Sequence, residues 1–483
     1  MSLEDLGFDP AKCLIGGAWV APAGGQTLPL MNPSTGEQIG EIARGQEADV
    51  DAAIDAARRA FEGGWARTPA AERGRILMRL GKLVEGRVEA LARLEALDVG
   101  KPLKQARADA LALARYCGFY GGAADKLMGE SIPYLDGYTV YTLREPHGVT
   151  AHIVPWNYPM QIIGRSVGAA LAAGNCCVLK PAEDACLTAL AFADLAKEAG
   201  LPDGVLNVVP GLGSEAGAAL SGHDGIDHIS FTGSVATGGM IQMAAAKHVK
   251  PVTLELGGKS PQLVFEDADL DAALPFLVNA GIQNAGQTCS ASSRILVQRK
   301  VYDEVTARMA ERYGALRVGQ AMSDLDVGPL ISAKQKGIVT GFLALGADLE
   351  MAAQGVLSDA PEGGNFVAPT LFAGVNASHA LARDEIFGPV QVIIPFEDEA
   401  EAVAIANGTE YGLVASVWTE NGARQMRLAK AIRAGQVFLN NYGAGGGVEL
   451  PFGGVGKSGH GREKGFEALY GVTTLKTVAA FHG

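Results

Sequence analysis

One cysteine in this sequence lies where a thiol could act as a nucleophile. Cys289 stands in Gly286-Gln-Thr-Cys-Ser-Ala-Ser-Ser-Arg294, among small and polar residues, after an apolar run from Leu274 to Ile282. A turn of this composition leaves a thiol approachable, and a reactive cysteine also needs a neighbour that favours its thiolate. A lone cysteine is otherwise more often a small buried hydrophobic residue. The interpretation therefore depends on the residues that accompany Cys289.

A carboxylate and an amide occupy positions that suit acyl chemistry. Glu255 lies between two leucines in Leu254-Glu-Leu-Gly-Gly-Lys-Ser-Pro261, where desolvation raises a carboxyl pKa as a general base requires. Asn157 lies in Pro155-Trp-Asn-Tyr-Pro159, whose prolines fix a loop, and its amide could donate to a developing oxyanion. Each residue has a structural alternative. Glu255 could be bonded to backbone amides, and Asn157 could satisfy the backbone of its own turn.

Three further motifs suit a nucleotide. Lys180-Pro-Ala-Glu183 offers a lysine and a carboxylate to ribose hydroxyls, although a solvated ion pair would read the same. Glu385-Ile-Phe-Gly-Pro389 offers a carboxylate for hydroxyls and an aromatic ring for a flat ligand, or it is a structural turn. Gly211-Leu-Gly213 holds only part of a glycine fingerprint, because position 216 is alanine, so a plain strand-to-helix turn explains it equally well.

Strands and helices alternate from residue 149 onward, which predicts a parallel sheet covered by helices. The predicted strands are Val149–Val154, Cys176–Leu179, Val205–Val209, His228–Phe231 and Val252–Leu254, and the helices are Gln161–Ala173, Thr188–Ala199, Glu215–Ser221 and Val235–Ala246. A second alternating region, from about Leu256 to Phe438, carries Cys289. Residues 49–128 are predicted to be helical, with Asp49 as an N-cap and Pro69 opening the second helix.

Composition restricts the classes of protein to which the chain can belong. Its 483 residues are 48% hydrophobic and 19% charged, as in soluble globular proteins of two or three domains. A net charge of −13 argues against a nucleic-acid partner, and no apolar run approaches the ~20 residues of a membrane span. No signal peptide is visible, and six scattered cysteines are typical of reduced thiols. We therefore expect a cytoplasmic protein, and we expect no metal site because no metal-ligand spacing of His or Cys is present.

Taken in order, these motifs make the chain resemble the aldehyde dehydrogenase superfamily over nearly its whole length. The resemblance implies NAD-dependent oxidation of an aldehyde to its acid. The implied fold is α/β, with a Rossmann-like NAD-binding domain, a second α/β catalytic domain and a small β oligomerisation arm. The matching stretches are Pro155-Trp-Asn-Tyr-Pro159, Phe231-Thr-Gly-Ser234, Leu254-Glu-Leu-Gly-Gly-Lys259, Gly286-Gln-Thr-Cys289, Glu385-Ile-Phe-Gly-Pro389, Pro451-Phe-Gly-Gly454 and Ser458-Gly-His-Gly-Arg-Glu463.

The resemblance implies a role for each catalytic residue. Cys289 would attack the aldehyde carbon, and Asn157, with the backbone N–H of Cys289, would stabilise the oxyanion. The thiohemiacetal would lose hydride to the nicotinamide and become a thioester, which water activated by Glu255 would hydrolyse. Glu463 resembles a carboxylate that some members use in proton transfer.

The resemblance also implies a cofactor site. Lys180 and Glu183 would hold the adenosine ribose, and Ser234 at a helix start would hold the pyrophosphate. Glu183 would repel a 2′-phosphate, which favours NAD, whereas NADP remains an alternative because Lys180 lies nearby. Glu385 would bind the nicotinamide ribose and Phe387 would pack on its ring. The other lining residues would be Val154, Trp156, Gly213, Gly233 and Leu256.

Domain limits and assembly follow from the same resemblance. The NAD-binding domain would comprise residues 1–127 and 147–256, the catalytic domain residues 257–450, and the oligomerisation arm residues 128–146 and 470–483. The arm would cross to a neighbouring subunit, since an exposed sheet edge needs a partner. A homodimer or homotetramer is therefore expected.

The substrate channel implied by the resemblance is unusually polar. Arg165 aligns with an arginine that semialdehyde-oxidising members use for the substrate carboxylate, but their second arginine falls at Gln283. We therefore hypothesise a polar or carboxylate-bearing aldehyde, the alternative being that Arg165 is paired with a nearby carboxylate. The glycine-rich loop 443–447 would also leave room for a bulky or aromatic aldehyde. The channel residues would be Tyr158, Gln161, Ile162, Arg165, Gln283, Thr288, Ser290 and Phe452.

Two rival functions are compatible with the same fold. In a coenzyme-A-acylating dehydrogenase a thiol replaces water at the thioester, and such members generally lack the carboxylate found here at Glu255. A non-catalytic protein, such as the lens crystallins related to this family, would not need Cys289, Glu255 and Asn157 together. Both rivals are therefore less favoured than a hydrolytic aldehyde dehydrogenase.

Overall fold

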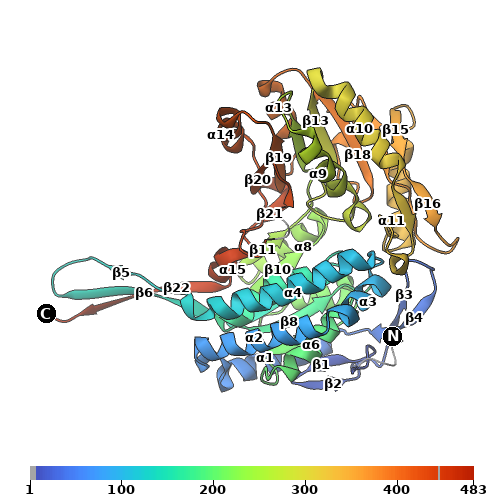
Figure 1. Ribbon diagram of the computed structural model, residues 1–483. Helices are drawn as coiled ribbons and strands as arrows, with labels where there is room; N and C mark the ends of the chain where they lie inside the picture. The colour runs from blue at the N-terminus through green and yellow to red at the C-terminus, as the bar shows by residue number, and fades with distance from the viewer. Residues whose placement is uncertain (1–6, 444–446) are drawn as a thin grey trace.

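The structure, a computed structural model, describes residues 7–443 and 447–483. Two large β-sheets, each with its own helices, form two lobes, and a narrow arm projects from the lobe that contains the N-terminal half of the chain (Figure 1). The α/β class expected from the sequence is confirmed.

The first sheet has eight strands whose central five run parallel, with antiparallel strands at both edges. The carboxyl ends of the parallel strands meet at one edge, because Val154 pairs with Pro181 and Thr232 pairs with Glu255. In spatial order the strands are β2 (Ala18–Val20), β1 (Cys13–Ile15), β9 (Leu206–Val208), β8 (Cys176–Pro181), β7 (Val149–Val154), β10 (His228–Thr232), β11 (Val252–Glu255) and β21 (Gly459–His460).

Helices cover both faces of this sheet. On one face lie α5 (Pro159–Ala173) and α6 (Leu187–Glu198), and three helices form an outer layer on them: α2 (Ala70–Gly86), α3 (Val88–Asp98) and α4 (Leu103–Ala123). The opposite face carries α1 (Glu47–Gly63), α7 (Ala218–Gly222) and α8 (Val235–Ala246).

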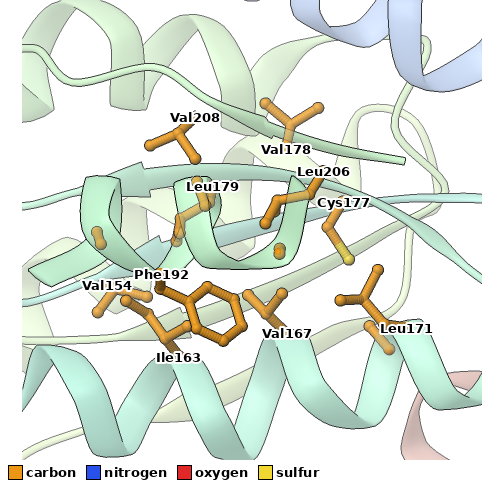
Figure 2. Close-up of a cluster of buried hydrophobic side chains, with 14 of the residues drawn as sticks. Val154, Ile163, Val167, Leu171, Cys177, Val178, Leu179, Phe192, Leu206 and Val208 are labelled. Atoms are coloured by element: carbon orange, nitrogen blue, oxygen red, sulfur yellow. The ribbon is translucent and has the colours of Figure 1, made fainter. Parts of the chain in front are cut away.

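The core of this lobe explains why its strands are almost continuously apolar. Both β7 and β8 are buried along their whole length, as strands covered on both faces must be. Figure 2 shows the Phe192 ring of α6 lying among aliphatic side chains of α5, β7, β8 and β9. Because each such side chain contributes about 1.5–3 kcal/mol on burial, this layer fixes the strand ends on which the candidate site is built.

The second sheet has seven strands and is parallel except at its β15 edge. In spatial order its strands are β15 (Glu350–Gln354), β17 (Thr370–Ala373), β18 (Val390–Phe396), β13 (Arg294–Gln298), β12 (Pro261–Val264), β19 (Val414–Trp418) and β20 (Gln436–Leu439). The helices of this lobe are α9 (Leu270–Ile282), α10 (Tyr302–Gly314), α11 (Ala333–Leu345), α12 (Ala380–Arg383), α13 (Glu399–Ala406) and α14 (Gly422–Ala431).

The arm is a three-stranded antiparallel sheet in the order β22 (Thr473–Phe481), β6 (Tyr138–Pro146) and β5 (Ser131–Ile132). Its long pairing runs from Thr473 opposite Pro146 to Phe481 opposite Tyr138, so the chain ends near the arm's tip (Figure 1). Helix α15 (Gly465–Gly471) leads into β22. Two small sheets pair β3 (Thr27–Met31) with β4 (Gln38–Ala43), and β14 (Arg317–Gly319) with β16 (Val356–Asp359).

The sequence-based elements agree with the structure in most places. The strand Val149–Val154 and the helix Val235–Ala246 have the expected bounds. The N-cap at Asp49 was wrong, because the helix begins at Glu47 after Gln46, and Asp49 instead accepts a hydrogen bond from the Gln46 backbone N–H at 2.9 Å. The domain limits stay a prediction, and β21 falls outside all of them. Within residues 7–443 and 447–483, no helix combines the length and hydrophobicity that a membrane crossing requires.

Candidate active site

The candidate nucleophile, Cys289, follows a short turn whose backbone adopts an unfavourable conformation. After α9, Asn284, Ala285 and Gly286 have φ angles of 48°, 53° and 73°, all in the left-handed region. Glycine tolerates this region, whereas the other two residues are strained there unless their surroundings hold them. A Cβ on Gly286 would come within 2.1 Å of the Gly388 carbonyl oxygen, so the turn also sits directly against the segment that precedes β18.

Side-chain amides hold this turn in place. Gln287 donates to the Asn284 carbonyl at 2.9 Å and accepts from the Ile331 backbone N–H at 2.9 Å. Asn157 donates through Nδ2 to the Gln287 carbonyl at 3.0 Å, and Asn284 donates through Nδ2 to the Asn157 carbonyl at 2.9 Å. The segment carrying Asn157 and the turn carrying Cys289 are therefore tied to each other, although they lie in different lobes.

Cys289 is partly exposed, whereas the other five cysteines of the chain are buried. It packs against a small apolar cluster that includes Leu413, Val414 and Phe452. Burial raises the pKa of its thiol to about 11, although the positive charges of Arg165 and Lys464 both lower it. The residue is thus partly open to solvent, and two nearby cations favour its anion against the effect of burial.

Glu255 ends β11 at the sheet edge and is 1% exposed. Neither of its carboxyl oxygens has a hydrogen-bond partner among the described residues, so the alternative that it caps backbone amides is not supported. Burial raises its pKa well above the usual range, against the opposing charge of Arg165. A Cβ on Gly453 would lie 2.7 Å from Glu255 Oε1, so a glycine at this position leaves room for the Glu255 carboxyl.

Arg165 projects from α5 into the same region and forms a buried ion pair with Glu463. Glu463 also accepts a hydrogen bond from Ser230 Oγ at 2.8 Å, and the Arg165 guanidinium lies 5.0 Å from the centroid of the Phe452 ring. This is the pairing that we named as the alternative to substrate binding. A guanidinium that is already paired with one carboxylate is not free to bind the carboxylate of a substrate.

Two other expected channel residues are engaged by a buried charge cluster. Gln161 donates through Nε2 to Asp109 Oδ1 at 2.5 Å. The Lys101 ammonium forms ion pairs with Asp109 and Glu95, and it lies 3.6 Å from the centroid of the Tyr158 ring. The Gln161 amide is therefore used in a hydrogen bond within the protein, and the Lys101 ammonium packs on the Tyr158 ring.

The remaining channel residues fall into different environments. Ser290 and Thr288 lie beside Cys289, with their hydroxyl oxygens 3.3 Å apart, and Ile162 is buried. Gln283 is exposed, and it is the position at which a second substrate-binding arginine was considered. The glycine-rich loop was predicted over 443–447, and its residues 444–446 lie outside those described.

Sequence reasoning missed four residues around the nucleophile. Leu413, Phe438 and Tyr442 belong to or pack against the cluster that contacts Cys289, and Tyr442 donates a hydrogen bond to the Ser290 carbonyl. Lys464 lies 5.1 Å from the centroid of the Phe452 ring. The sequence contained only a partial indication of these residues. The aromatic residues directly precede the glycine-rich loop, and Lys464 directly follows a recognised motif.

The residues expected to bind the adenosine ribose lie at the carboxyl end of β8. The Lys180 ammonium donates to the Pro181 carbonyl at 2.8 Å and lies 3.3 Å from Glu183 Oε2. Lys180 is 3% exposed and burial lowers its pKa, whereas Glu183 is partly exposed. The pair is therefore not a fully solvated one. It presents one ammonium and one carboxylate at the sheet edge.

Beyond the carboxyl end of β10, the chain enters helix α8. Ser234 is the N-cap of α8, and its hydroxyl accepts from the Thr237 backbone N–H at 3.2 Å. A Cβ on Gly233 would lie 2.5 Å from the Phe231 ring, whereas a Cβ on Gly213 would meet nothing within 4 Å. Val154 and Leu256 are buried beside their strand ends. Helix N-termini of this kind favour phosphate.

Glu385 and Phe387 complete the expected cofactor residues from the second lobe. Glu385 accepts from the Gly258 backbone N–H at 3.0 Å, and burial raises its pKa to about 7. Phe387 has a φ of 54° and packs edge-on against Trp156, with ring centroids 5.4 Å apart. This contact brings Phe387, the expected packing partner of the nicotinamide ring, against Trp156, which was expected to line the same cleft.

Comparison with known proteins places these features in a family. The model of the family described as "Aldehyde dehydrogenase family" matches residues 19–478. A mitochondrial aldehyde dehydrogenase from Arabidopsis thaliana, family 2 member B4, is 44% identical over 97% of this chain and 87% of that protein. A crystal structure from Burkholderia cenocepacia, provisionally assigned as an aldehyde dehydrogenase, is 64% identical, with a TM-score of 0.97 over 98% of this chain and 100% of that one. The NAD⁺ complex of a Bacillus cereus aldehyde dehydrogenase is 41% identical, with a TM-score of 0.94 over 98% and 96%.

Proposed function

This chain belongs to the aldehyde dehydrogenase family, and we propose that it oxidises an aldehyde to the carboxylic acid, with Cys289 as nucleophile and NAD as hydride acceptor. The observation that carries the proposal is the arrangement around Cys289. The partly exposed residue Cys289 follows a strained turn that is tied to Asn157. The buried carboxyl of Glu255, which has no hydrogen-bond partner among the described residues, belongs to the same group of interacting charges.

The first step is addition of the Cys289 thiolate to the aldehyde carbon, which moves the carbonyl π electrons onto oxygen. Asn157 Nδ2 carries two hydrogens, of which one donates to the Gln287 carbonyl, so the other is available to that oxyanion. The backbone N–H of Cys289 would be the second donor. Donors fixed in advance stabilise an oxyanion without reorganisation, which is why the ties between Asn157 and the turn matter.

The second half of the reaction is hydrolysis. Bound NAD would supply the hydride acceptor, and loss of hydride would leave the former aldehyde carbon as the carbonyl of a thioester on Cys289. Glu255 then removes a proton from water as the water oxygen attacks, and Cys289 leaves as the thiolate with release of the acid. A carboxyl whose pKa is raised by burial is a stronger base than an ordinary one once it is ionised.

The residues at the sheet edge fit NAD. The N-terminus of α8 at Ser234 suits the pyrophosphate, the Lys180–Glu183 pair suits the adenosine ribose, and a Cβ built on Gly213 would meet nothing within 4 Å. Glu385, with one oxygen held by the Gly258 N–H, keeps its other oxygen for the second ribose. Glu183 would accept from the 2′-hydroxyl, so we expect NAD to be used in preference to NADP.

For the substrate we favour an aromatic or other neutral aldehyde over a carboxylated one. The carboxylate hypothesis relied on Arg165, which is paired with Glu463, and on Gln161, which donates to Asp109. The side chains that pack around the nucleophile are instead largely apolar, including Phe452, Phe438 and Tyr442. Such walls favour a flat or aliphatic aldehyde by burial of apolar area.

An aldehyde panel tests both the activity and this preference. NADH absorbance is followed at saturating NAD with benzaldehyde, butanal and succinate semialdehyde, and kcat/KM is compared. We expect NADH formation with all three and the lowest kcat/KM for succinate semialdehyde. A semialdehyde kcat/KM above that of butanal would restore the carboxylate hypothesis. The absence of NADH from every aldehyde would point to the non-catalytic rival, and an acyl-coenzyme A product would point to the acylating one.

We also propose that the arm mediates assembly into a homodimer or homotetramer. Its sheet leaves the outer edges of β22 and β5 without a strand partner among the described residues, and the side chains of Leu143, Leu475 and Phe481 are at least 40% exposed. Unpaired edges with apolar side chains are normally covered by another strand. Light scattering of the purified chain should give twice or four times the 50.0 kDa monomer mass, and a monomer at micromolar concentration would refute the proposal.

A further inference from the structure

Lys464 stands in a strained backbone conformation between a recognised motif and α15. Its φ is 61°, in the left-handed region that glycine adopts freely and lysine does not. The preceding residue, Glu463, pairs with Phe452 through two backbone hydrogen bonds of 2.6 and 2.7 Å, which fix where the Lys464 side chain begins. Strained residues of this kind persist where the surroundings hold them and cluster at functional sites.

Two cations lie around one aromatic ring. The Arg165 guanidinium carbon and the Lys464 ammonium are 5.0 and 5.1 Å from the centroid of Phe452. Cys289 packs against the cluster to which that ring belongs. The ring thus brings both positive charges into the neighbourhood of the nucleophile.

The two charges are not equally available. Arg165 is held in a buried ion pair with Glu463, although it still lowers the thiol pKa more than Lys464 does. The Lys464 ammonium forms no ion pair within 4.0 Å among the described residues, although Glu255 and Glu463 lie near enough to raise its pKa. The carboxyls that face Cys289 are Glu255 and Glu385, and burial raises the pKa of each, which reduces the negative charge opposing a thiolate near neutral pH.

We propose that Lys464 is a charge-tuning residue of the active site, whose ammonium stabilises the Cys289 thiolate before aldehyde arrives. This role lies beyond the proposed function, because it concerns ionisation of the thiol and not the oxidation that follows. Arg165 lowers the thiol pKa more strongly, but its charge belongs to a buried ion pair, so Lys464 is the cation whose charge can be removed without breaking such a pair.

The contribution of Lys464 should itself depend on pH. Burial, with added repulsion from Arg165, lowers the pKa of Lys464 to about 8, while Cys289, Glu255 and Glu463 act in the opposite direction. Below that pH the ammonium is charged and supports the thiolate, and above it the support is lost. The two titrations are coupled. Removing the lysine should therefore reduce the amount of thiolate only in the pH range in which Lys464 is protonated in the wild type.

The experiment measures alkylation of Cys289 in the full chain, with no aldehyde or cofactor added. Iodoacetamide reacts with the thiolate, and mass spectrometry of the peptide gives a rate constant for this residue at each pH from 7 to 10. For Lys464→Met we expect an alkylation rate about five- to tenfold below wild type at pH 7, since a nearby charge shifts a pKa by about one unit. The ratio of the two rates should approach one above pH 9.

Three control variants separate charge from structure. Lys464→Arg keeps the charge and should retain the wild-type rate at pH 7, with an excess over wild type above pH 9. Lys464→Gly removes the charge and relieves the strained φ, so it should fold at least as well and still behave like Lys464→Met. Lys457→Met changes the charge by the same amount at an exposed lysine already paired with Glu410, and it should alter nothing.

The pattern of rates decides the matter. Equal rates for wild type, Lys464→Met and Lys464→Gly at pH 7 would overturn the proposal, as would a loss that is the same at every pH, because that indicates a structural change. The readout needs no turnover, so its failure leaves the proposed oxidation untouched, and an inactive enzyme would still give an interpretable alkylation profile.

Discussion

The nucleotide side and the acyl side of this active site are built in different ways. On the nucleotide side, Lys180 and Ser234 lie at the carboxyl ends of β8 and β10, two strands of one parallel sheet that end at the same edge. The acyl side gathers Arg165 from a helix, Cys289 from a strained turn, and Phe452 and Lys464 from segments near the end of the chain. Parallel sheets place their ligands by topology, whereas the acyl side depends on particular side-chain contacts.

This difference predicts how changes on the two sides should act. A change on the nucleotide side should alter cofactor affinity and selectivity while leaving the thiol chemistry intact. A change on the acyl side should alter the chemistry, or the stability of the fold, because its charges are buried together.

The largest effect should follow Cys289→Ala. Without a nucleophile no thioester forms, and we expect the rate of NADH formation to fall by at least about 10⁴-fold, while NAD still binds with near wild-type affinity by fluorescence titration. The matched control is Cys117→Ala, since that thiol is buried in the helical core and should affect only stability. Retained activity in Cys289→Ala would remove the basis of the whole mechanism.

Glu255→Gln should slow hydrolysis and spare the first half-reaction. We expect a rapid burst of about one NADH per subunit, followed by turnover reduced about 10²-fold, with the thioester visible by mass spectrometry after acid quench. In the wild type, deacylation should accelerate with rising pH, because burial raises the Glu255 pKa and the base acts only when ionised. A linear time course with no burst would mean that hydrolysis is not the step that this substitution slows.

Arg165→Leu should act on stability as much as on catalysis. The side chains of Arg165 and Glu463 are 6% and 4% exposed, and removing one partner of a buried pair costs about 3 kcal/mol because the other charge is left unpaired. Denaturant unfolding should show this loss, and the double change Arg165→Leu with Glu463→Leu should recover most of it. Full additivity of the two single losses would mean that the residues do not act as a pair.

The smallest effect should come from the nucleotide side. Glu183→Gln removes the charge that would repel a 2′-phosphate, and we expect the ratio of kcat/KM for NAD to that for NADP to fall about tenfold, with the benzaldehyde KM unchanged. Asp184→Asn alters the neighbouring exposed carboxylate and serves as the control. An equal drop in both variants would indicate a general electrostatic effect and not recognition by Glu183.

The same contrast explains how much could be predicted from the sequence. The alternation of strand and helix located β7, β8, β10, β11 and α8 within one or two residues, since buried parallel strands are continuous apolar runs. Motifs at strand ends then placed the nucleotide-side residues, because topology alone brings such ends together.

The acyl side was less predictable because it depends on long-range pairing. No local pattern says that Gln161 turns toward Asp109, or that Arg165 is matched by Glu463 nearly three hundred residues later. For Lys464 the only signal was its position directly after a recognised motif, and a lysine after a glutamate is normally interpreted as part of a solvated ion pair. The N-cap at Asp49 failed for a smaller reason, in that a capping box places its acidic residue three positions inside the helix start.

The long pairing in the arm has a consequence for biosynthesis. Thr474 contacts His147 across 327 residues of chain, so β6 emerges from the ribosome well before β22 exists. At about 5–20 residues per second this interval lasts on the order of 16–65 s. During that time the backbone of β6 and the rings of Tyr138 and Tyr141 lack the partner strand that later flanks them. Nascent chains should therefore recruit chaperones at this segment, and slowing translation downstream of residue 147 should increase aggregation of newly made protein.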